Sequence, residues 1–348
     1  MANTISGLAG SEAMRTAIQK IQLQLAKGQK ELASGTIADE GLTLGSKVGQ
    51  AFSLSNQQSQ LTAILETNKL ASTRMQALQT SMTSIMSSAK DFSTQLMASR
   101  SSTENASNIA TQAKTLLASF EGILNTSVSG EYIFAGENSS VKPVASYFST
   151  PASAAQQAID ASFQATFGFP PGDPQAKNIS QADMQSFLDN QFQSAFDAAN
   201  WSATTSSASD TPIKSRISPN ESVDTSVTAN EPAMRKLAMA YTMVAGLGVD
   251  QMNSGAYQAT MEKAISMIGE AVSDLTSAQA KVGYAQQRVS AANDRMTLQS
   301  NMLESSLGDL VGVDYNEVTM RIQSLTTQME MAYTVTGRIQ KLSLLNFL

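Results

Sequence analysis

The placement of proline constrains this chain more than any other sequence feature. All eight prolines lie between Pro143 and Pro232 in a chain of 348 residues. Proline lacks a backbone N–H and clashes with the preceding helical turn, so long helices need proline-free sequence. The two flanks are therefore free to form long helices, whereas the middle segment has to be broken into shorter elements.

Both flanks carry heptad repeats of apolar residues. One repeat covers Leu61–Leu96 and the other covers Met261–Leu303. Between them, a shorter stripe of Ile109, Ala113, Leu116, Phe120 and Ile123 predicts a helix that returns along the first repeat. Apolar residues that alternate by three and four positions over several heptads are typical of coiled coils. We expect the polar residues in the second repeat either to set the helix register or to face solvent; they are Gln279, Gln286 and Asn293.

Shorter apolar stripes lie near both ends of the chain, and each lacks a partner adjacent in sequence. Asp314 and Glu317 have the spacing of a capping box, so we expect the last helix to begin there. Gly28 interrupts the first stripe, and the glycines of segment 35–49 indicate a loop. We expect the two stripes to pair with each other and their outward faces to contact neighbouring subunits. The predicted assembly residues are Met14, Ile18, Ile21, Leu25, Val318, Ile322, Leu325, Met329, Ile339, Leu342, Leu345, Phe347 and Leu348.

The proline-containing segment has the composition of a separate insert. It holds nine of the twenty aromatic residues and is acidic, which favours a compact core of its own. A four-residue period from Met184 to Phe196 predicts a helix, and 213–227 is expected to be extended. We predict a mainly α protein, an elongated helical bundle or coiled-coil rod built from both flanks, with a mixed α/β inserted domain. The predicted domains are 1–40 with 314–348, 41–136 with 233–313, and 137–232.

Composition excludes most kinds of catalytic site. The chain contains neither histidine nor cysteine, which removes imidazole bases, thiolate nucleophiles and the usual zinc ligands. We expect no catalytic, cofactor-binding or metal-binding residues. The net charge of −6 argues against nucleic-acid binding. No run reaches the roughly 18 apolar residues of a membrane helix, and 1–10 does not resemble a signal peptide. We expect no membrane insertion, and a cytoplasmic protein or one exported without a cleaved signal.

Three motifs resemble the flagellin superfamily: Glu31–Gly35 (ELASG), Gly130–Gly136 (GEYIFAG) and Leu342–Leu348 (LSLLNFL). The last two are most similar to the hook–filament junction members, the hook-associated protein 3 group. The sequence after Gly35, TIADEGL, differs from the Asp-rich segment expected in that group.

The resemblance implies a structural role in the bacterial flagellum and in motility. The implied route is type III export without a cleaved signal, which places the protein outside the cell. The implied partners are copies of the chain in a ring or tubular layer, hook-associated protein 1, the flagellin filament and an export chaperone. The alternatives are a filament-forming flagellin, an enzyme carried by the insert, and a coiled-coil protein of a needle-type secretion apparatus.

Overall fold

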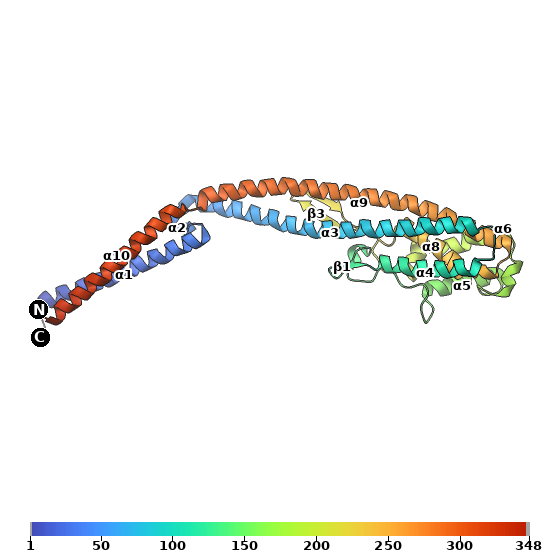
Figure 1. The fold of residues 1–348 in the computed structure, drawn as a ribbon, viewed down its shortest axis with the longest axis horizontal. Helices are drawn as coiled ribbons and strands as arrows, with labels where there is room; N and C mark the ends of the chain where they lie inside the picture. Colours follow the sequence, from blue (N-terminus) through green and yellow to red (C-terminus); the bar gives the residue numbers. More distant parts are fainter. Residues whose placement is uncertain (1, 346–348) are drawn as a thin grey trace. The chain divides into compact units, whose positions relative to one another are not determined.

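The computed structural model describes the backbone of residues 2–345 and the side chains of residues 12–338. Helices dominate the described residues, and two short hairpins supply the strands (Figure 1). The prediction of a mainly α chain with a mixed insert is confirmed. The helices are α1 (Ala2–Ser34), α2 (Glu40–Leu44), α3 (Val48–Ser99), α4 (Ala106–Leu124), α5 (Ala154–Phe167), α6 (Gln181–Phe187), α7 (Ala198–Thr204), α8 (Pro232–Gly246), α9 (Ser254–Val311) and α10 (Tyr315–Leu345). The strands are β1 (Ser127–Val128), β2 (Glu131–Tyr132), β3 (Lys214–Ser218) and β4 (Glu221–Asp224).

The chain divides into two compact units. The first contains residues 1–63 and 296–348, and the second contains residues 64–295. The insert belongs to the second unit together with the helices that surround it. The division into three domains drawn from the sequence stays a prediction.

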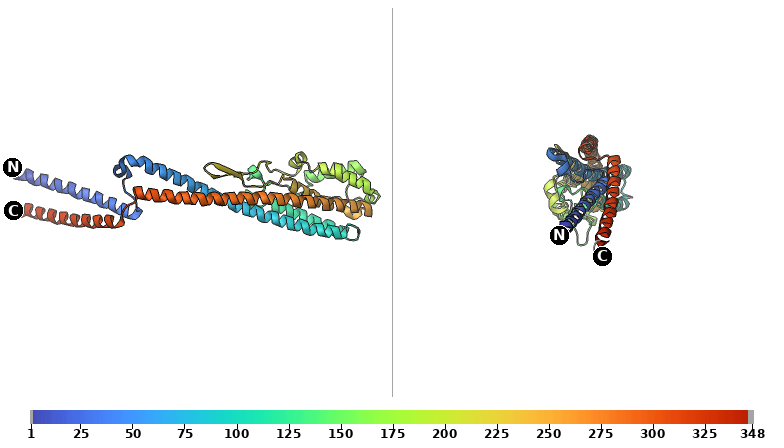
Figure 2. Two further views of the ribbon diagram at one scale, coloured as in Figure 1. Left: turned by 90° about the horizontal axis from the view of Figure 1, so that it is seen from above. Right: turned by 90° about the vertical axis from the view of Figure 1, so that its left-hand side faces the viewer.

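In the first unit, α1 and α10 lie side by side (Figures 1 and 2). The start of α10 is as predicted, because Asp314 Oδ1 accepts a hydrogen bond from the backbone N–H of Asn316 at 2.8 Å. The segment expected to be a glycine loop is more ordered than that. It contains α2, whose first turn is capped by Asp39 Oδ1, and α3 begins at Val48 and so includes Gly49.

The long heptad seam predicted for the N-terminal flank is confirmed in the second unit. Met75, Met82 and Phe92 of α3 are buried, as are Leu275 and Val289 of α9. Burial of apolar side chains at these spacings is what holds paired long helices together.

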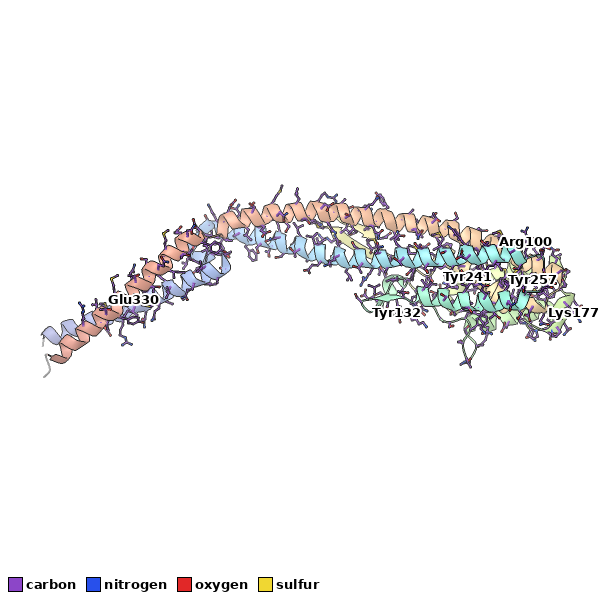
Figure 3. All side chains as sticks on the ribbon, viewed as in Figure 1. Arg100, Tyr132, Lys177, Tyr241, Tyr257 and Glu330 are labelled. Atoms are coloured by element: carbon purple, nitrogen blue, oxygen red, sulfur yellow. The ribbon has the colours of Figure 1, made fainter. Side chains whose placement is uncertain are left out.

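Helix α4 packs against α8, and its buried face differs from the predicted one. The sequence pattern predicted that Leu116 and Ile123 face the core, but both are only partly buried, and Leu117 and Leu124 are buried instead. A strict 3.5-residue seam applies to a coiled coil, whereas a helix packed on a broader bundle follows its natural 3.6-residue period. The rings of Phe92 and Phe120 both pack against Tyr241 in this core (Figure 3).

The GEYIFAG motif contributes only the short strand β2. Only β2 pairs, antiparallel to β1, while the following Phe134 is buried without belonging to a strand. Gly136 has φ +60°, and a Cβ there would lie 2.6 Å from the carbonyl oxygen of Thr211. The motif therefore ends in a close approach between backbones that only glycine allows.

The insert is α/β, as predicted. Its predicted central helix begins as α6 and continues as a π-helical turn over Leu188–Phe192, which keeps Met184, Leu188, Phe192 and Phe196 buried. The segment predicted to be extended is the β3–β4 hairpin, with an irregularity between Arg216 and Ser218. No helix among the described residues is long and apolar enough to cross a membrane.

Candidate assembly interface

The structure brings the predicted assembly residues together wherever it describes them. Met14, Ile18, Ile21 and Leu25 line one side of α1 and are partly buried. On α10, Val318 and Leu325 are buried, and Ile322 and Met329 are partly buried. The side chains of Ile339, Leu342, Leu345, Phe347 and Leu348 lie outside the described residues.

The two helices run antiparallel. Gln22 Nε2 of α1 donates to the hydroxyl oxygen of Tyr333 on α10 at 3.1 Å, and Glu31 forms an ion pair with Arg321. A higher residue number on α1 thus corresponds to a lower number on α10. The intramolecular pairing predicted from the two stripes is present.

Gly28 does not interrupt the seam, contrary to the prediction. It is buried, and a Cβ on it would lie 3.0 Å from Ile322 Cγ1. The physical reason is that a residue without a side chain lets two helices approach closely. Gly28 is therefore a contact point between α1 and α10.

The ELASG motif builds the turn at the end of α1. The carboxylate of Glu31 pairs with Arg321 and also accepts the backbone N–H of Ala38 at 3.2 Å. Gly35 has φ +71°, and a Cβ there would lie 2.6 Å from the hydroxyl oxygen of Tyr315. Both ends of the motif thus depend on side chains from the start of α10.

Backbone hydrogen bonds join the same turn to the link between α9 and α10. The N–H of Ile37 donates to the carbonyl of Val311 at 2.8 Å, and the N–H of Val313 donates to the carbonyl of Gly35 at 3.2 Å. The sequence from Thr36 to Leu42, which departs from the family pattern, therefore still makes a defined turn. This turn sets where α1 and α10 begin to pair.

The outward face of α10 carries large apolar residues that the sequence reasoning missed. Met320 is 64% exposed and Met331 is 56% exposed. They are eleven positions apart, close to three full turns, so they lie on one face of the helix. The spacing of Met320 and Met331 could be read from the sequence. It was overlooked because the stripe through Leu325 contains more apolar residues. Other exposed apolar residues in this unit are Leu23, Leu32, Leu42, Phe52, Leu298, Met302, Tyr315, Tyr333 and Val335.

The titratable groups with clearly shifted pKa values lie in the second unit. Burial raises the pKa of Glu121, even though its carboxylate accepts hydrogen bonds from the Tyr147 N–H at 2.8 Å and the Ser146 hydroxyl at 2.9 Å. Burial also raises the pKa of Tyr241. Among the described residues, no three acidic side chains are grouped closely enough to hold a metal ion. The apolar faces of α1 and α10 are therefore the strongest candidate for a functional surface.

Family comparisons match both flanks of the chain. The bacterial flagellin N-terminal helical region matches residues 5–139, and the bacterial flagellin C-terminal helical region matches residues 265–348. Together these regions cover more than half of the chain. The residues they leave unmatched contain most of the insert.

Similar curated proteins are flagellins. Flagellin A of Rhizobium meliloti is 34% identical over 110 residues, which cover 31% of this chain and 26% of that protein. Flagellin D of Rhizobium meliloti strain 1021 is 32% identical over 124 residues, which cover 36% of this chain and 28% of that protein. The matched region thus spans about a quarter of the length of these relatives.

A solved structure shares the fold. It is described as a putative flagellar hook-associated protein from Vibrio parahaemolyticus, and it superposes with a TM-score of 0.52 over 77% of this chain and 99% of that chain. The sequences are 10% identical, so this likeness concerns the fold.

Proposed function

Because the chain belongs to the flagellin superfamily, we propose that it is a non-enzymatic structural component of the bacterial flagellum that joins the hook region to the filament. The observation that carries the proposal is the exposed apolar face of α10 around Met320 and Met331, next to the paired α1–α10 seam. Covering such a face with a second subunit removes apolar surface from water and so lowers the free energy of the assembly. In this proposal copies of the chain form a ring or tubular layer, in which the seam holds each subunit together and the outward faces join neighbours.

The remaining partners follow from the junction role. Hook-associated protein 1 would contact one side of the layer and the flagellin filament the other. An export chaperone would cover the apolar helices before type III export, without a cleaved signal, to the outside of the cell. The same assembly surface would extend through the remaining predicted assembly residues, which are Ile339, Leu342, Leu345, Phe347 and Leu348.

Two substitutions test the assembly face. Met320→Glu and Met331→Glu each place a charge on an exposed position, so we expect folding to be kept and assembly to be lost. Met97→Glu is the matched control, because Met97 is 49% exposed on α3 in the other unit. The readouts are helical content by circular dichroism, sedimentation of assemblies and swimming of complemented cells. Normal assembly of both α10 variants would refute the role of this face.

A filament-forming flagellin is the second candidate, and the identity to Rhizobium flagellins favours it. The similarity in fold to the putative flagellar hook-associated protein, together with the GEYIFAG and LSLLNFL motifs, favours the junction role. Seeding purified protein on isolated hooks separates the two. A short terminal layer is expected for a junction protein, and long filaments would identify a flagellin.

Deleting Lys341–Leu348 tests the last segment. We expect a secreted protein that fails to retain filaments, because the deletion removes apolar residues assigned to contacts with neighbours. Normally attached filaments would show that these residues are not needed at the junction.

A further inference from the structure

A cavity of about 350 Å³ lies in the insert, between the end of α5 and the α6 region. Small-molecule sites in proteins commonly have volumes of about 300–1,000 Å³. Asn178 lines the cavity. Its neighbour in the chain, Lys177, is labelled in Figure 3 and marks this part of the insert. Neither the paired flanks nor the proposed assembly face accounts for this cavity.

Aromatic rings form the apolar part of the cavity. Phe167 and Phe169 are partly exposed and nearly parallel, with ring centroids 6.4 Å apart and an interplanar angle of 28°. The buried ring of Phe187 lies 5.3 Å from that of Phe167. The faces of such rings are electron-rich and attract the C–H bonds of a flat, weakly polar ligand.

The aromatic rings are held by a constrained turn. Gly168 ends α5 with φ +87°, and its N–H donates to the carbonyl of Gln164 at 2.8 Å. Two prolines follow Phe169, and a Cβ on Gly248 would lie 2.4 Å from the Cα of Gly172. A rigid backbone on both sides of Phe169 lowers the entropy cost of presenting its ring to a ligand.

The polar part of the cavity offers hydrogen-bonding groups that the protein leaves free. Among the described residues, the side-chain amides of Asn178 and Gln191 and the hydroxyl of Ser186 take no part in hydrogen bonds within the chain, while Asp183 Oδ2 accepts from Ser180 at 2.7 Å. An amide both donates and accepts, as a sugar hydroxyl does. The lining contains one carboxylate and no Lys or Arg, which disfavours phosphate and other anions.

We propose that this cavity binds a neutral carbohydrate. One face of the sugar ring packs against Phe167 and Phe169, and its hydroxyls bond to Asn178, Asp183 and Gln191. This binding activity is independent of the assembly role of the helical flanks.

Saturation-transfer NMR on the full chain tests the proposal with cellobiose, maltose and diacetylchitobiose as probes. We expect transfer to the ring C–H protons of at least one disaccharide, and none to glucose 6-phosphate. Phe169→Ala and Gln191→Ala should each weaken binding about tenfold or more. Tyr284→Ala, which removes a 63% exposed aromatic ring on α9, should bind as the wild type does. Because Gln191 is exposed, its variant keeps the test valid even if Phe169→Ala folds poorly.

The overturning results are equally specific. They are absence of transfer to all three disaccharides, unchanged binding by Gln191→Ala, equal loss in Tyr284→Ala, or binding of a Phe-Pro-Pro peptide in place of the sugars. Retention on cellulose, amylose or chitin beads would identify a polymeric glycan as the source, and binding of the soluble disaccharides alone would identify free sugars.

Discussion

The side-chain amide of Asn68 on α3 donates to Oδ1 of Asn293 on α9 at 2.7 Å, and it also donates to the carbonyl of Ile217 in β3 at 2.9 Å. Asn68 is fully buried. One polar side chain thus connects two long helices and the hairpin of the insert. A buried polar side chain such as that of Asn68 finds its partners at one alignment only, so it sets the register of the two helices. The sequence left two roles open for Asn293, setting the helix register or facing solvent, and the structure favours the first.

Replacing Asn68 should destabilise the second unit. Asn68→Ala removes both hydrogen bonds and leaves the buried Ile217 carbonyl without this donor, so we expect a loss of about 1–3 kcal/mol in the free energy of unfolding. Urea unfolding followed by circular dichroism measures it. Glu66→Ala, at an exposed position on the same helix, is the control and should change little. Equal stability of the two variants would contradict a structural role for Asn68.

Two glycine substitutions should change the free energy of unfolding in opposite directions. At Gly35 an alanine adopts a left-handed conformation at a cost of about 1–2 kcal/mol and also displaces Tyr315. At Gly49, in the first turn of α3, nothing lies within 4 Å of an added Cβ, so Gly49→Ala should gain about 0.4–1 kcal/mol by restricting the unfolded chain. Urea unfolding compares the two, and a Gly35→Ala variant as stable as Gly49→Ala would disprove the interpretation of this turn.

The packing of α1 against α10 at Gly28 should depend on the size of the side chain at position 28. Gly28→Leu inserts a side chain where Ile322 already packs, and we expect a cost of about 1–3 kcal/mol from overpacking. Adding Ile322→Ala should recover part of that stability, because it frees the space. A double-mutant cycle measures the coupling, and strictly additive effects would show that the two residues do not meet.

Glu121 should make stability depend on pH. Burial raises its pKa above the ordinary 4.5, so between 4.5 and the raised pKa the folded chain binds more protons than the unfolded chain. The free energy of unfolding therefore falls as pH rises through that window.

Glu121→Gln removes this dependence while keeping an acceptor for the Tyr147 N–H. The stability of the variant relative to the wild type should increase with pH across the window and then level off. Urea unfolding at a series of pH values measures it, and the absence of histidine leaves few other side chains to titrate between pH 5 and 8. Asp91→Asn, at an exposed acid on α3, is the control and should follow the wild-type curve.

Periodicity alone predicted the long helices of the two flanks, because it is a local property of the chain. The seam through Met75 and Phe92 and the start of α10 at Asp314 needed no knowledge of their partners. The pairing of the terminal stripes was also predictable, since neither stripe could be buried by its own neighbours.

Which residues form the contacts between helices was decided only by the tertiary structure. The sequence interpretation took Gly28 as an interruption of the stripe, but in the structure it is a contact point with Ile322. The absence of a side chain can be interpreted only when the facing surface is known. The buried face of α4 shifted to Leu117 and Leu124 for the same reason, since the width of the surface it packs on selects the helical period. Local spacing thus determined the helices, and contacts between residues far apart in the chain determined their register and which apolar faces stay exposed.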